Sequence, residues 1–293
     1  MSTLPRLRHL VRSDFVKKLG PIFLGVLGAI WLLIEFTTWA FPEAAVHNRV
    51  LFLLACGLSL VAAMLFSFPR LTYAKYFPSK SVTIELVVGD ILDPASPSNI
   101  AVLSSDYFDS CAKTAISPHS VVAKLIASYF SGKNEEFDSR VDESLLAQGI
   151  TGQENPEKVN GRNRTKQYPI GTTAAVSTGI KKAFIVVGTH FDDRSTKTTA
   201  TPLTTWVSLH SLWSAAAVHG HRQSLSVPLW GAHLGNAPGN RLVLFQTLLC
   251  SFASASATMN QPPTSHLQIF VWKGDYRPAE FDAMRDILEN FEM

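Results

Sequence analysis

The chain has 293 residues, of which 46% are hydrophobic and 17% charged, and its formal net charge at pH 7 is +3. A charge balance this even is not typical of a protein whose main partner is nucleic acid. The cysteines form no CxxC pair, which argues against a disulfide scaffold and fits a reducing compartment. They are Cys56, Cys111 and Cys250.

Two apolar runs, Pro21–Phe41 and Val50–Phe68, stand close together near the N-terminus. Each is long enough to cross the roughly 30 Å hydrocarbon core of a bilayer at about 1.5 Å per residue. Only PEAAVHNR lies between them, so we expect a transmembrane helical hairpin in contact with membrane lipid. The expected division of the chain is a basic segment over residues 1–20, the hairpin over 21–68, a linker over 69–80 and a soluble domain over 81–293.

Basic residues flank the two runs on both outer sides. By the positive-inside rule, we expect a multi-pass protein of the inner (cell) membrane with a cytoplasmic N-terminus and a cytoplasmic soluble domain. A cleaved signal peptide is the alternative for the first run, although its apolar core exceeds the roughly 7–15 residues of a signal core. The flanking residues are Arg6, Arg8, Arg12, Lys17 and Lys18 before the runs, and Arg70, Lys75 and Lys80 after them.

Glu35 is an acidic residue inside the first apolar run. A carboxylate in hydrocarbon is costly, so Glu35 either contacts another subunit or lines a pore, or it lies near the membrane interface beside Trp31 and Trp39. The sequence leaves both interpretations open. Small residues on both runs would allow the helices to approach closely. These are Gly25, Gly28, Ala55, Gly57, Ser59, Ala62 and Ala63.

Strand-like and helix-like segments alternate through the soluble part, which predicts a layered α/β domain with a largely parallel sheet. Residues 131–167 are polar and are expected to form an insertion or loop with one short helix. The expected strands are residues 82–88, 99–103, 183–187, 225–229 and 267–272, and the expected helices are residues 119–130, 203–218, 238–252 and one from about Pro278. The helix over residues 203–218 is expected to face inward with Trp206, Leu209, Trp213 and Ala216. The helix from about Pro278 is expected to face inward with Phe281, Met284, Ile287 and Phe291.

Three groups of candidate binding residues follow strands or open helices. In α/β sheets of this kind, ligands bind beyond the carboxyl ends of the strands. Glycine-rich turns and helix N-termini there direct backbone N–H groups at an anion, so the pattern suits a nucleotide diphosphate. The groups are Asp90 and Ile91; Ser104, Ser105 and Asp106 with the helix-opening Ser117, His119 and Ser120; and Gly231, Ala232, His233, Leu234, Gly235 and Asn236.

Other nucleotide and catalytic motifs do not fit. The chain contains neither GxxxxGK[ST] nor a complete Rossmann fingerprint. His219 and His221 lie at an expected helix end with no cysteine or third ligand nearby in sequence, so we expect no metal site. No Ser/His/Asp arrangement can be assembled around His233. The sequence therefore predicts no catalytic residue and no cofactor.

The soluble half resembles a macro domain along nearly its full length. The segments VTIELVVGDIL, NIAVLSSDYFD, ISPHSVVAKL, KKAFIVVGT and SLSVPLWGAHLGN carry the resemblance in that order. It implies a three-layer α/β/α domain that binds ADP-ribose, with Asp90 and Ile91 at the adenine. It also implies that Ser117–Val121 and Gly231–Asn236 form two phosphate loops. The chain departs from the hydrolytic macro domains at Ser104-Ser105-Asp106 and Ser117-Pro118-His119, which favours binding over de-ADP-ribosylation.

The hairpin followed by this domain is similar to the membrane-bound ThsA effectors of type II Thoeris antiphage defence. That resemblance implies a signal from a TIR-domain partner, a histidine conjugate of ADP-ribose, that drives homo-oligomerisation, membrane disruption and abortive infection. Candidates for contacting the distal group of such a ligand are Asp106, Tyr107, Glu135 and Glu136. The alternatives are a membrane-tethered ADP-ribosyl hydrolase and a constitutive scaffold whose macro domain binds a protein.

Overall fold

The structure, a computed structural model, forms two compact units. One contains residues 1–71 and 273–281, and the other contains residues 72–272 and 282–293. It describes residues 3–40, 48–67, 71–93, 96, 98–110, 116–155, 164–179, 181–192, 197–230, 240–259 and 261–293, with only the backbone at 3–14, 48–50, 192 and 197.

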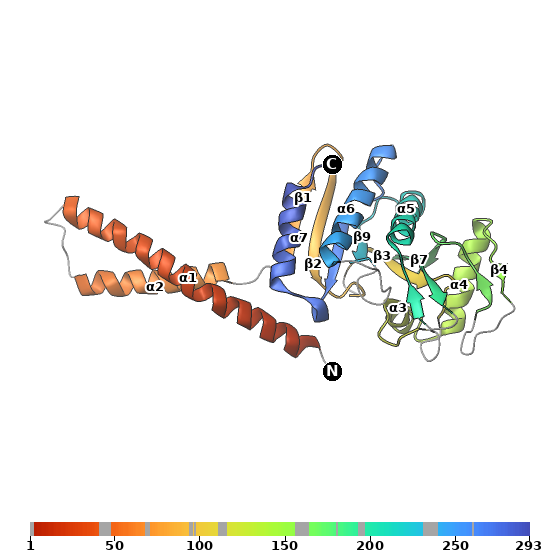
Figure 1. The fold of residues 1–293 in the computed structure, drawn as a ribbon, viewed down its shortest axis with the longest axis horizontal. Helices are drawn as coiled ribbons and strands as arrows, with labels where there is room; N and C mark the ends of the chain where they lie inside the picture. The colour runs from red at the N-terminus through yellow and green to blue at the C-terminus, as the bar shows by residue number, and fades with distance from the viewer. Residues whose placement is uncertain are drawn as a thin grey trace. The chain divides into compact units, whose positions relative to one another are not determined.

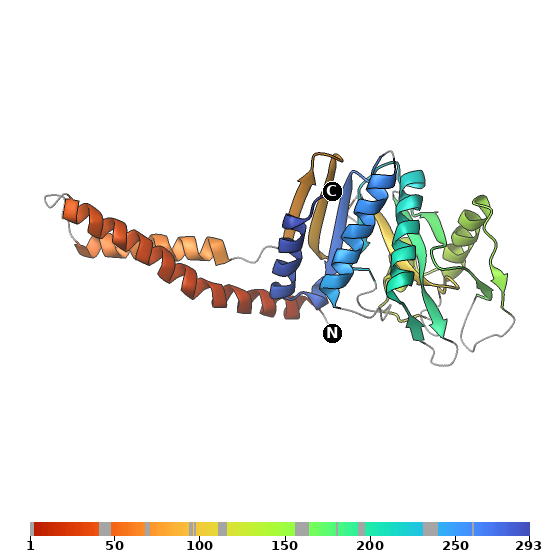
Figure 2. The same cartoon turned by 45° about the horizontal axis from the view of Figure 1, so that its top comes forward.

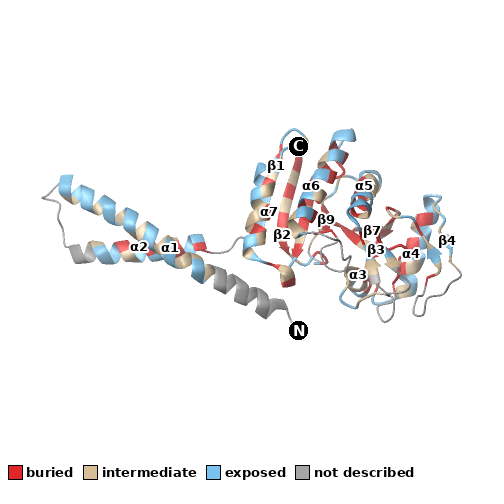
Figure 3. Cartoon of the chain, in the orientation of Figure 1, coloured by how far each residue is buried: buried red, intermediate tan, exposed pale blue. Residues whose placement is uncertain are grey.

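The first unit contains two helices, α1 (Thr3–Ala40) and α2 (Asn48–Ser67) (Figure 1). The basic residues, expected as a separate segment, continue into the first apolar run as one helix that passes through Pro21. Within the described residues, Phe15–Ala40 is long and apolar enough to cross a membrane, whereas the apolar part of α2, Leu51–Ser67, is shorter. Most of the described side chains of both helices are exposed (Figure 3).

Small residues line the buried face of α2. Ala55, Ser59 and Ala63 recur at every fourth position and are buried, and the Ser59 hydroxyl donates to the Ala55 carbonyl at 2.6 Å. The ring of Trp31 in α1 also meets the ring of Phe52 in α2 edge to face, with the ring centroids 5.9 Å apart. Small side chains at this spacing let two helices approach closely.

The glycines of the two helices do not take part in this contact, contrary to expectation. Gly25, Gly28 and Gly57 are exposed, and a Cβ added to any of them would meet no atom within 4 Å. The side chain of Glu35 is exposed as well. In this pair of helices, the close approach therefore depends on alanine and serine rather than on glycine.

The second unit is built on a mixed sheet with the strand order β1-β2-β10-β9-β3-β7-β6, and β8 pairs with the end of β7. The strands β2, β10, β9, β3 and β7 are parallel to their neighbours among these, while β1, β6 and β8 pair antiparallel. The bounds are β1 Thr72–Phe77, β2 Val82–Gly89, β3 Asn99–Ser105, β6 Thr173–Ser177, β7 Lys182–Asp192, β8 Lys197–Thr199, β9 Leu225–Pro228 and β10 His266–Trp272.

Helices cover both faces of the sheet. On one face, Leu125 of α3 (Val121–Tyr129) and Val141 of α4 (Asn134–Ala147) share a buried cluster with Val102 of β3 and Ile185 of β7. On the other face lie α5 (Pro202–His219) and α6 (Arg241–Thr258), followed by the end of α7 (Pro278–Asn290) (Figure 2). This is the expected three-layer α/β/α arrangement.

The expected strands are all present, but other elements differ from the expectations. The linker expected over residues 69–80 contains β1, which pairs with β2 along its whole length. The polar region 131–167 contains the well-formed helix α4 and a two-stranded sheet of β4 (Gln153–Glu154) and β5 (Lys166–Gln167). The helix α4 has a narrow buried stripe of Phe137, Val141 and Leu145, which is enough to anchor it.

Three helix details also need correction. The helix expected from Pro238 begins at Arg241, where the Asn240 side chain accepts from the Leu242 amide at 3.1 Å and caps it. Trp206, expected on the inner face of α5, is 40% exposed. In α7, Leu288 is buried, whereas Ile287 is only half-buried, as is Phe291, which follows the helix.

Candidate functional site

Asp90 lies at the carboxyl edge, which is the edge of the sheet where the parallel strands end. It directly follows β2, is exposed, and accepts the Leu92 amide on Oδ1 at 3.1 Å. The Asp93 amide donates to the Asp90 carbonyl at 3.2 Å, which completes a turn. Ile91 is 7% exposed and its side chain belongs to the core, so the expected contact of Ile91 with a ligand can involve only its backbone.

Beside Asp90 is an open depression of about 410 Å³ between the start of the 90–98 loop and the outer side of α3. Trp272 ends β10 opposite Gly89 of β2, and its ring is 37% exposed. The Nζ atom of Lys124 lies 5.3 Å from the centroid of that ring. The depression is lined by Asp90, Leu92, Asp93, Lys124, Ala127 and Ser128. An exposed carboxylate and a partly exposed indole thus follow the ends of two neighbouring strands.

Sequence reasoning missed Trp272 and Lys124. Both lie inside segments that read as regular elements, Trp272 as the last residue of a strand and Lys124 as a polar position of a helix. The available signal was that Trp272 ends its strand at the same edge as Asp90, where an exposed aromatic residue is available for stacking.

Hydrogen bonds from Lys181 hold the loop that carries Asp90 in place. The Lys181 side chain is buried, and Nζ donates to the carbonyls of Asp93 at 3.3 Å and Ser96 at 2.9 Å. The same Nζ lies 5.1 Å from the ring of Tyr129, whose hydroxyl donates to the Leu92 carbonyl at 3.4 Å. Lys181 and Tyr129 therefore hold the 90–98 loop against α3.

We expect Lys181→Ala to loosen this loop. The change removes the donor of two partly buried hydrogen bonds, to the Asp93 and Ser96 carbonyls, which costs about 1 kcal/mol of stability. We expect ADP-ribose affinity to fall several-fold because Asp90 is less well positioned. Thermal unfolding and calorimetric titration of the full-length protein in detergent measure both effects. Lys182→Ala is the matched control, because the Lys182 Nζ donates to the His219 carbonyl instead, at 2.8 Å. An equal loss of affinity in both variants would contradict the assigned role of Lys181.

The second group of candidates, at the end of β3, lies inside the fold. Ser104 and Ser105 are part of the strand and are buried, and the Ser105 hydroxyl donates to Asp109 Oδ2 at 2.6 Å. A ligand contact by these two residues stays a prediction. They position the turn that follows β3.

Asp106 is also buried, with no exposed surface. Its Oδ2 accepts from Gln167 Nε2 at 2.8 Å and lies 3.3 Å from His190 Nδ1, while Oδ1 accepts the Phe191 amide at 3.1 Å. The His190 side chain is 54% exposed. A direct ligand contact by Asp106 stays a prediction, and in the structure its carboxylate lies beside the exposed imidazole of His190, which sequence reasoning missed.

The helix-opening candidates form a turn that caps α3. The Ser120 hydroxyl accepts the Ala123 amide at 3.1 Å, and the Ser117 hydroxyl accepts the His119 amide at 3.2 Å. The side chain of His119 is exposed, and Val121 is half-buried. The third group, Gly231, Ala232, His233, Leu234, Gly235 and Asn236, lies outside the described residues.

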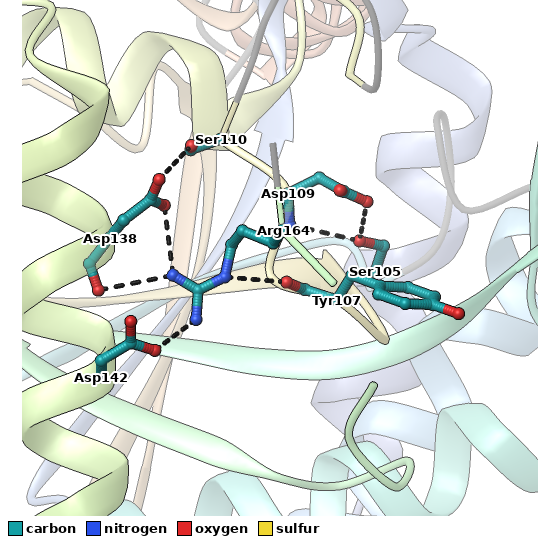
Figure 4. A network of polar contacts seen from close by, with 7 residues as sticks. All are labelled: Ser105, Tyr107, Asp109, Ser110, Asp138, Asp142 and Arg164. Carbon is teal, nitrogen blue, oxygen red and sulfur yellow. Dashed lines mark hydrogen bonds and ion pairs between the residues drawn. The ribbon is translucent and has the colours of Figure 1, made fainter. Parts of the chain in front are cut away.

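Arg164 ties the polar insertion to the turn after β3 (Figure 4). Its side chain is 8% exposed, pairs with Asp142 and, at 3.3 Å, with Asp138, and Nε donates to the Tyr107 carbonyl at 3.0 Å. The Ser110 hydroxyl donates to Asp138 at 3.0 Å. Burial raises the pKa of the Asp138 carboxyl above its ordinary value, although Arg164 and Ser110 oppose this shift. The insertion is thus anchored by a buried cation.

The candidates for the distal end of a ligand are not brought together. Tyr107 is buried, and its hydroxyl accepts from Asn155 Nδ2 at 2.7 Å. Glu135 and Glu136 lie exposed in the first turn of α4, where acidic side chains favour the helix dipole. Within the described parts of the chain, no group of three His, Cys, Asp or Glu side chains is arranged to hold a metal ion.

Comparison with known proteins places this geometry in a family. Solved structures of the Oceanobacillus iheyensis macrodomain are similar in fold. A mutant "with ADPR" has a TM-score of 0.49 at 12% identity, covering 75% of this chain and 100% of that one. The form "with ADP" has a TM-score of 0.47 at 11% identity, covering 74% and 95%. No curated protein matches. The sequence model of the family "Thoeris protein ThsA, Macro domain" matches residues 84–271, which is more than half of the chain. The protein therefore belongs to the Thoeris ThsA macro-domain family, with its macro domain behind an apolar N-terminal helix that is long enough to span a membrane.

Proposed function

We propose that the protein is a membrane-anchored receptor whose macro domain binds an ADP-ribose derivative at the carboxyl edge. The observation that carries the proposal is the exposed carboxylate of Asp90 directly after β2, at the edge where the neighbouring strand β10 ends in the partly exposed Trp272. Adenine presents an exocyclic amino donor next to a ring-nitrogen acceptor. The Asp90 carboxylate accepts from the amino group, the Ile91 backbone N–H donates to the ring nitrogen, and Trp272 stacks on the base.

The spacing of the strand ends supports an elongated ligand. In the sheet, β3 lies three strands from β2, with β10 and β9 between them. At about 4.8 Å per strand, Asp90 and the end of β3 are roughly 14 Å apart. An adenine at β2 therefore places a diphosphate over β10 and β9 and a second ribose near His190. The N-terminus of α3 and the 231–236 loop are the proposed partners of the diphosphate.

Binding, rather than hydrolysis, is the leading proposal for this edge. The side chains that follow β3 are buried and engaged with one another, so none of Ser104, Ser105 and Asp106 is placed to activate water. One observation favours the second candidate, an ADP-ribosyl hydrolase: a buried carboxylate that orients an exposed imidazole is a general-base arrangement. His190→Ala separates the two candidates, since it would abolish turnover by a hydrolase and leave a receptor able to bind.

The remaining steps follow from the family and from the apolar helix. We propose that the hairpin crosses the inner membrane twice, that a TIR-domain protein makes the signal, and that this signal is a histidine conjugate of ADP-ribose, as the ThsA resemblance implies. Binding drives oligomerisation of the hairpins, membrane disruption and abortive infection. A ligand can drive such a change only through a higher affinity for the active state.

The test is calorimetric titration of the full-length protein in detergent with ADP-ribose, its histidine conjugate and ADP, with chromatographic product analysis of the same samples. Micromolar or tighter binding without new products supports the receptor. If products form with the unchanged protein but not with the His190→Ala variant, the protein is a hydrolase. If none of the nucleotides binds, the alternative of a protein-binding scaffold remains. A dye-leakage assay in liposomes then tests whether the bound nucleotide opens the membrane.

Trp272→Ala is expected to weaken ADP-ribose binding about 10- to 100-fold, because stacking of a base on an aromatic side chain contributes roughly 1–3 kcal/mol. Trp272→Phe should keep most of the affinity. Trp206→Ala is a matched control, because Trp206 has a similar exposure, 40% against 37%, and lies on α5, on the opposite face of the sheet from α3. Unchanged affinity in Trp272→Ala would remove the stacking role.

A further inference from the structure

The strand β1 forms one edge of the sheet, and the directions of its backbone groups can be deduced from its neighbour (Figures 1 and 2). The Thr83 amide of β2 donates to the Ser265 carbonyl at 3.0 Å, which is on the β10 side. Because backbone groups alternate along a strand, Ile84 directs its groups toward β1, where it is paired with Lys75. The neighbouring residues of β1 therefore direct their N–H and C=O groups outward. They are Thr72, Ala74 and Tyr76.

The two edges of the sheet differ in whether side chains bond to their outward backbone groups. At the opposite edge, α4 covers β6: Gln148 Nε2 donates to the Thr173 carbonyl at 3.1 Å, and the Ala175 amide donates to Ser144 Oγ at 2.8 Å. At β1, no side chain in the described part of the chain bonds to the outward backbone groups. An uncovered edge strand is a template for pairing with another strand.

The usual devices that block an edge are also missing from β1. The strand has no proline, and its pairing with β2 runs without a register shift from Thr72 to Phe77. Its one charged side chain, Lys75, is turned toward α7, where Nζ donates to the carbonyls of Glu289 at 2.7 Å and Phe291 at 2.6 Å. The edge is therefore uncapped, regular and free of outward charge.

We propose that β1 pairs antiparallel with β1 of a second copy of this chain, joining two sheets into one. The pairing is centred on Ala74, which lies opposite Ala74 of the second copy, and Thr72 lies opposite Tyr76. In this register Lys75 faces Tyr73. A pairing centred on Lys75 would instead place two lysines opposite each other, which is unfavourable.

A second copy is the occupant because of where β1 lies in the chain. The apolar helix α2 ends at Ser67, and β1 begins at Thr72. A short edge pairing is weak between freely diffusing molecules. Copies anchored in one bilayer hold their β1 strands close to the same membrane surface, and this confinement raises the effective concentration of the edge. A soluble peptide has no such advantage. The inference rests on the proposed membrane anchoring and is independent of the ligand's identity.

Disulfide cross-linking in liposomes tests the pairing and its register, in a background where Cys56, Cys111 and Cys250 are replaced by alanine. Directly opposed residues have Cα atoms about 5.5 Å apart, within disulfide range, whereas residues four positions out of register are roughly 13 Å apart. We expect Ala74→Cys protein to form a covalent dimer on mild oxidation and Tyr76→Cys protein not to. A mixture of Thr72→Cys and Tyr76→Cys proteins should cross-link. Equal cross-linking of Ala74→Cys and Tyr76→Cys proteins would overturn the register.

A backbone variant tests the pairing without relying on cysteine chemistry at position 74. Ala74→Pro removes an outward N–H, which an edge strand tolerates, and Ala74→Val keeps it. In the Thr72→Cys and Tyr76→Cys mixture, we expect Ala74→Pro to lower the cross-linked fraction at least tenfold and Ala74→Val to preserve it. Flotation with liposomes and ADP-ribose affinity are measured on the same proteins. Failure to float would refute the membrane anchoring, whereas flotation without any cross-link at Ala74 would refute the pairing alone.

Discussion

Asp90→Ala is expected to weaken ADP-ribose binding about 10- to 150-fold while leaving the fold intact. A hydrogen bond to a charged group contributes roughly 1.5–3 kcal/mol, and the adenine amino group loses its acceptor. The stability change is small because Asp90 is exposed and its side-chain bond is a local one to the Leu92 amide. Calorimetric titration and thermal unfolding of the full-length protein in detergent measure the two quantities separately.

The matched control for Asp90 is Asp93→Ala. Asp93 is also an exposed carboxylate and lines the same depression, but it follows the turn rather than the strand end. If the carboxylates acted only through the electrostatic field, both variants would lose affinity equally, and the adenine assignment would be withdrawn. We expect Asp93→Ala to change the affinity less than threefold.

The central parallel strands were predictable because each is a short apolar run bounded by turn signals, as in Val82–Gly89 and His266–Trp272. The strand β1 was not, since TYAKYF mixes lysine and tyrosine and directly follows a presumed membrane span. The helix α4 was expected only as one short helix in a polar region, and its length was underestimated for a related reason. Its buried stripe of Phe137, Val141 and Leu145 is a single narrow row among charged residues, and tertiary contacts rather than periodicity hold it.

Within the site, position was easier to predict than burial. Asp90 follows a recognisable strand, and its exposure agrees with the expectation. Asp106 follows an equally recognisable strand, yet it is buried because Gln167 and Phe191, far away in sequence, supply its donors. No local sequence pattern around Asp106 predicts these distant partners. Trp272 is the opposite case. An aromatic residue at the end of an apolar strand is ordinarily expected to be buried in the core, yet Trp272 is partly exposed.

Arg164→Ala is expected to lower the free energy of unfolding by about 2–4 kcal/mol, because it leaves a partly buried carboxylate without its counter-ion. The change also leaves the Tyr107 carbonyl without its donor. Urea unfolding of the full-length protein in detergent measures this loss. Arg140→Ala is the matched control, because Arg140 pairs with Glu143 at 3.5 Å on the exposed side of α4. An exposed pair contributes about 0.5 kcal/mol or less.

The pH dependence of this loss identifies its cause. Arg164 lowers the pKa of Asp138, so removing Arg164 raises the pKa of that carboxyl further above its ordinary value. A carboxyl with a raised pKa in the folded protein takes up a proton on folding. Its contribution to stability is present at low pH and is lost as the pH rises through the folded-state pKa. The deficit of Arg164→Ala should therefore be largest at neutral pH and shrink as the pH falls toward about 4. A deficit that is the same at both pH values would mean that Arg164 acts through packing and its bond to Tyr107, and that the ion pair contributes little.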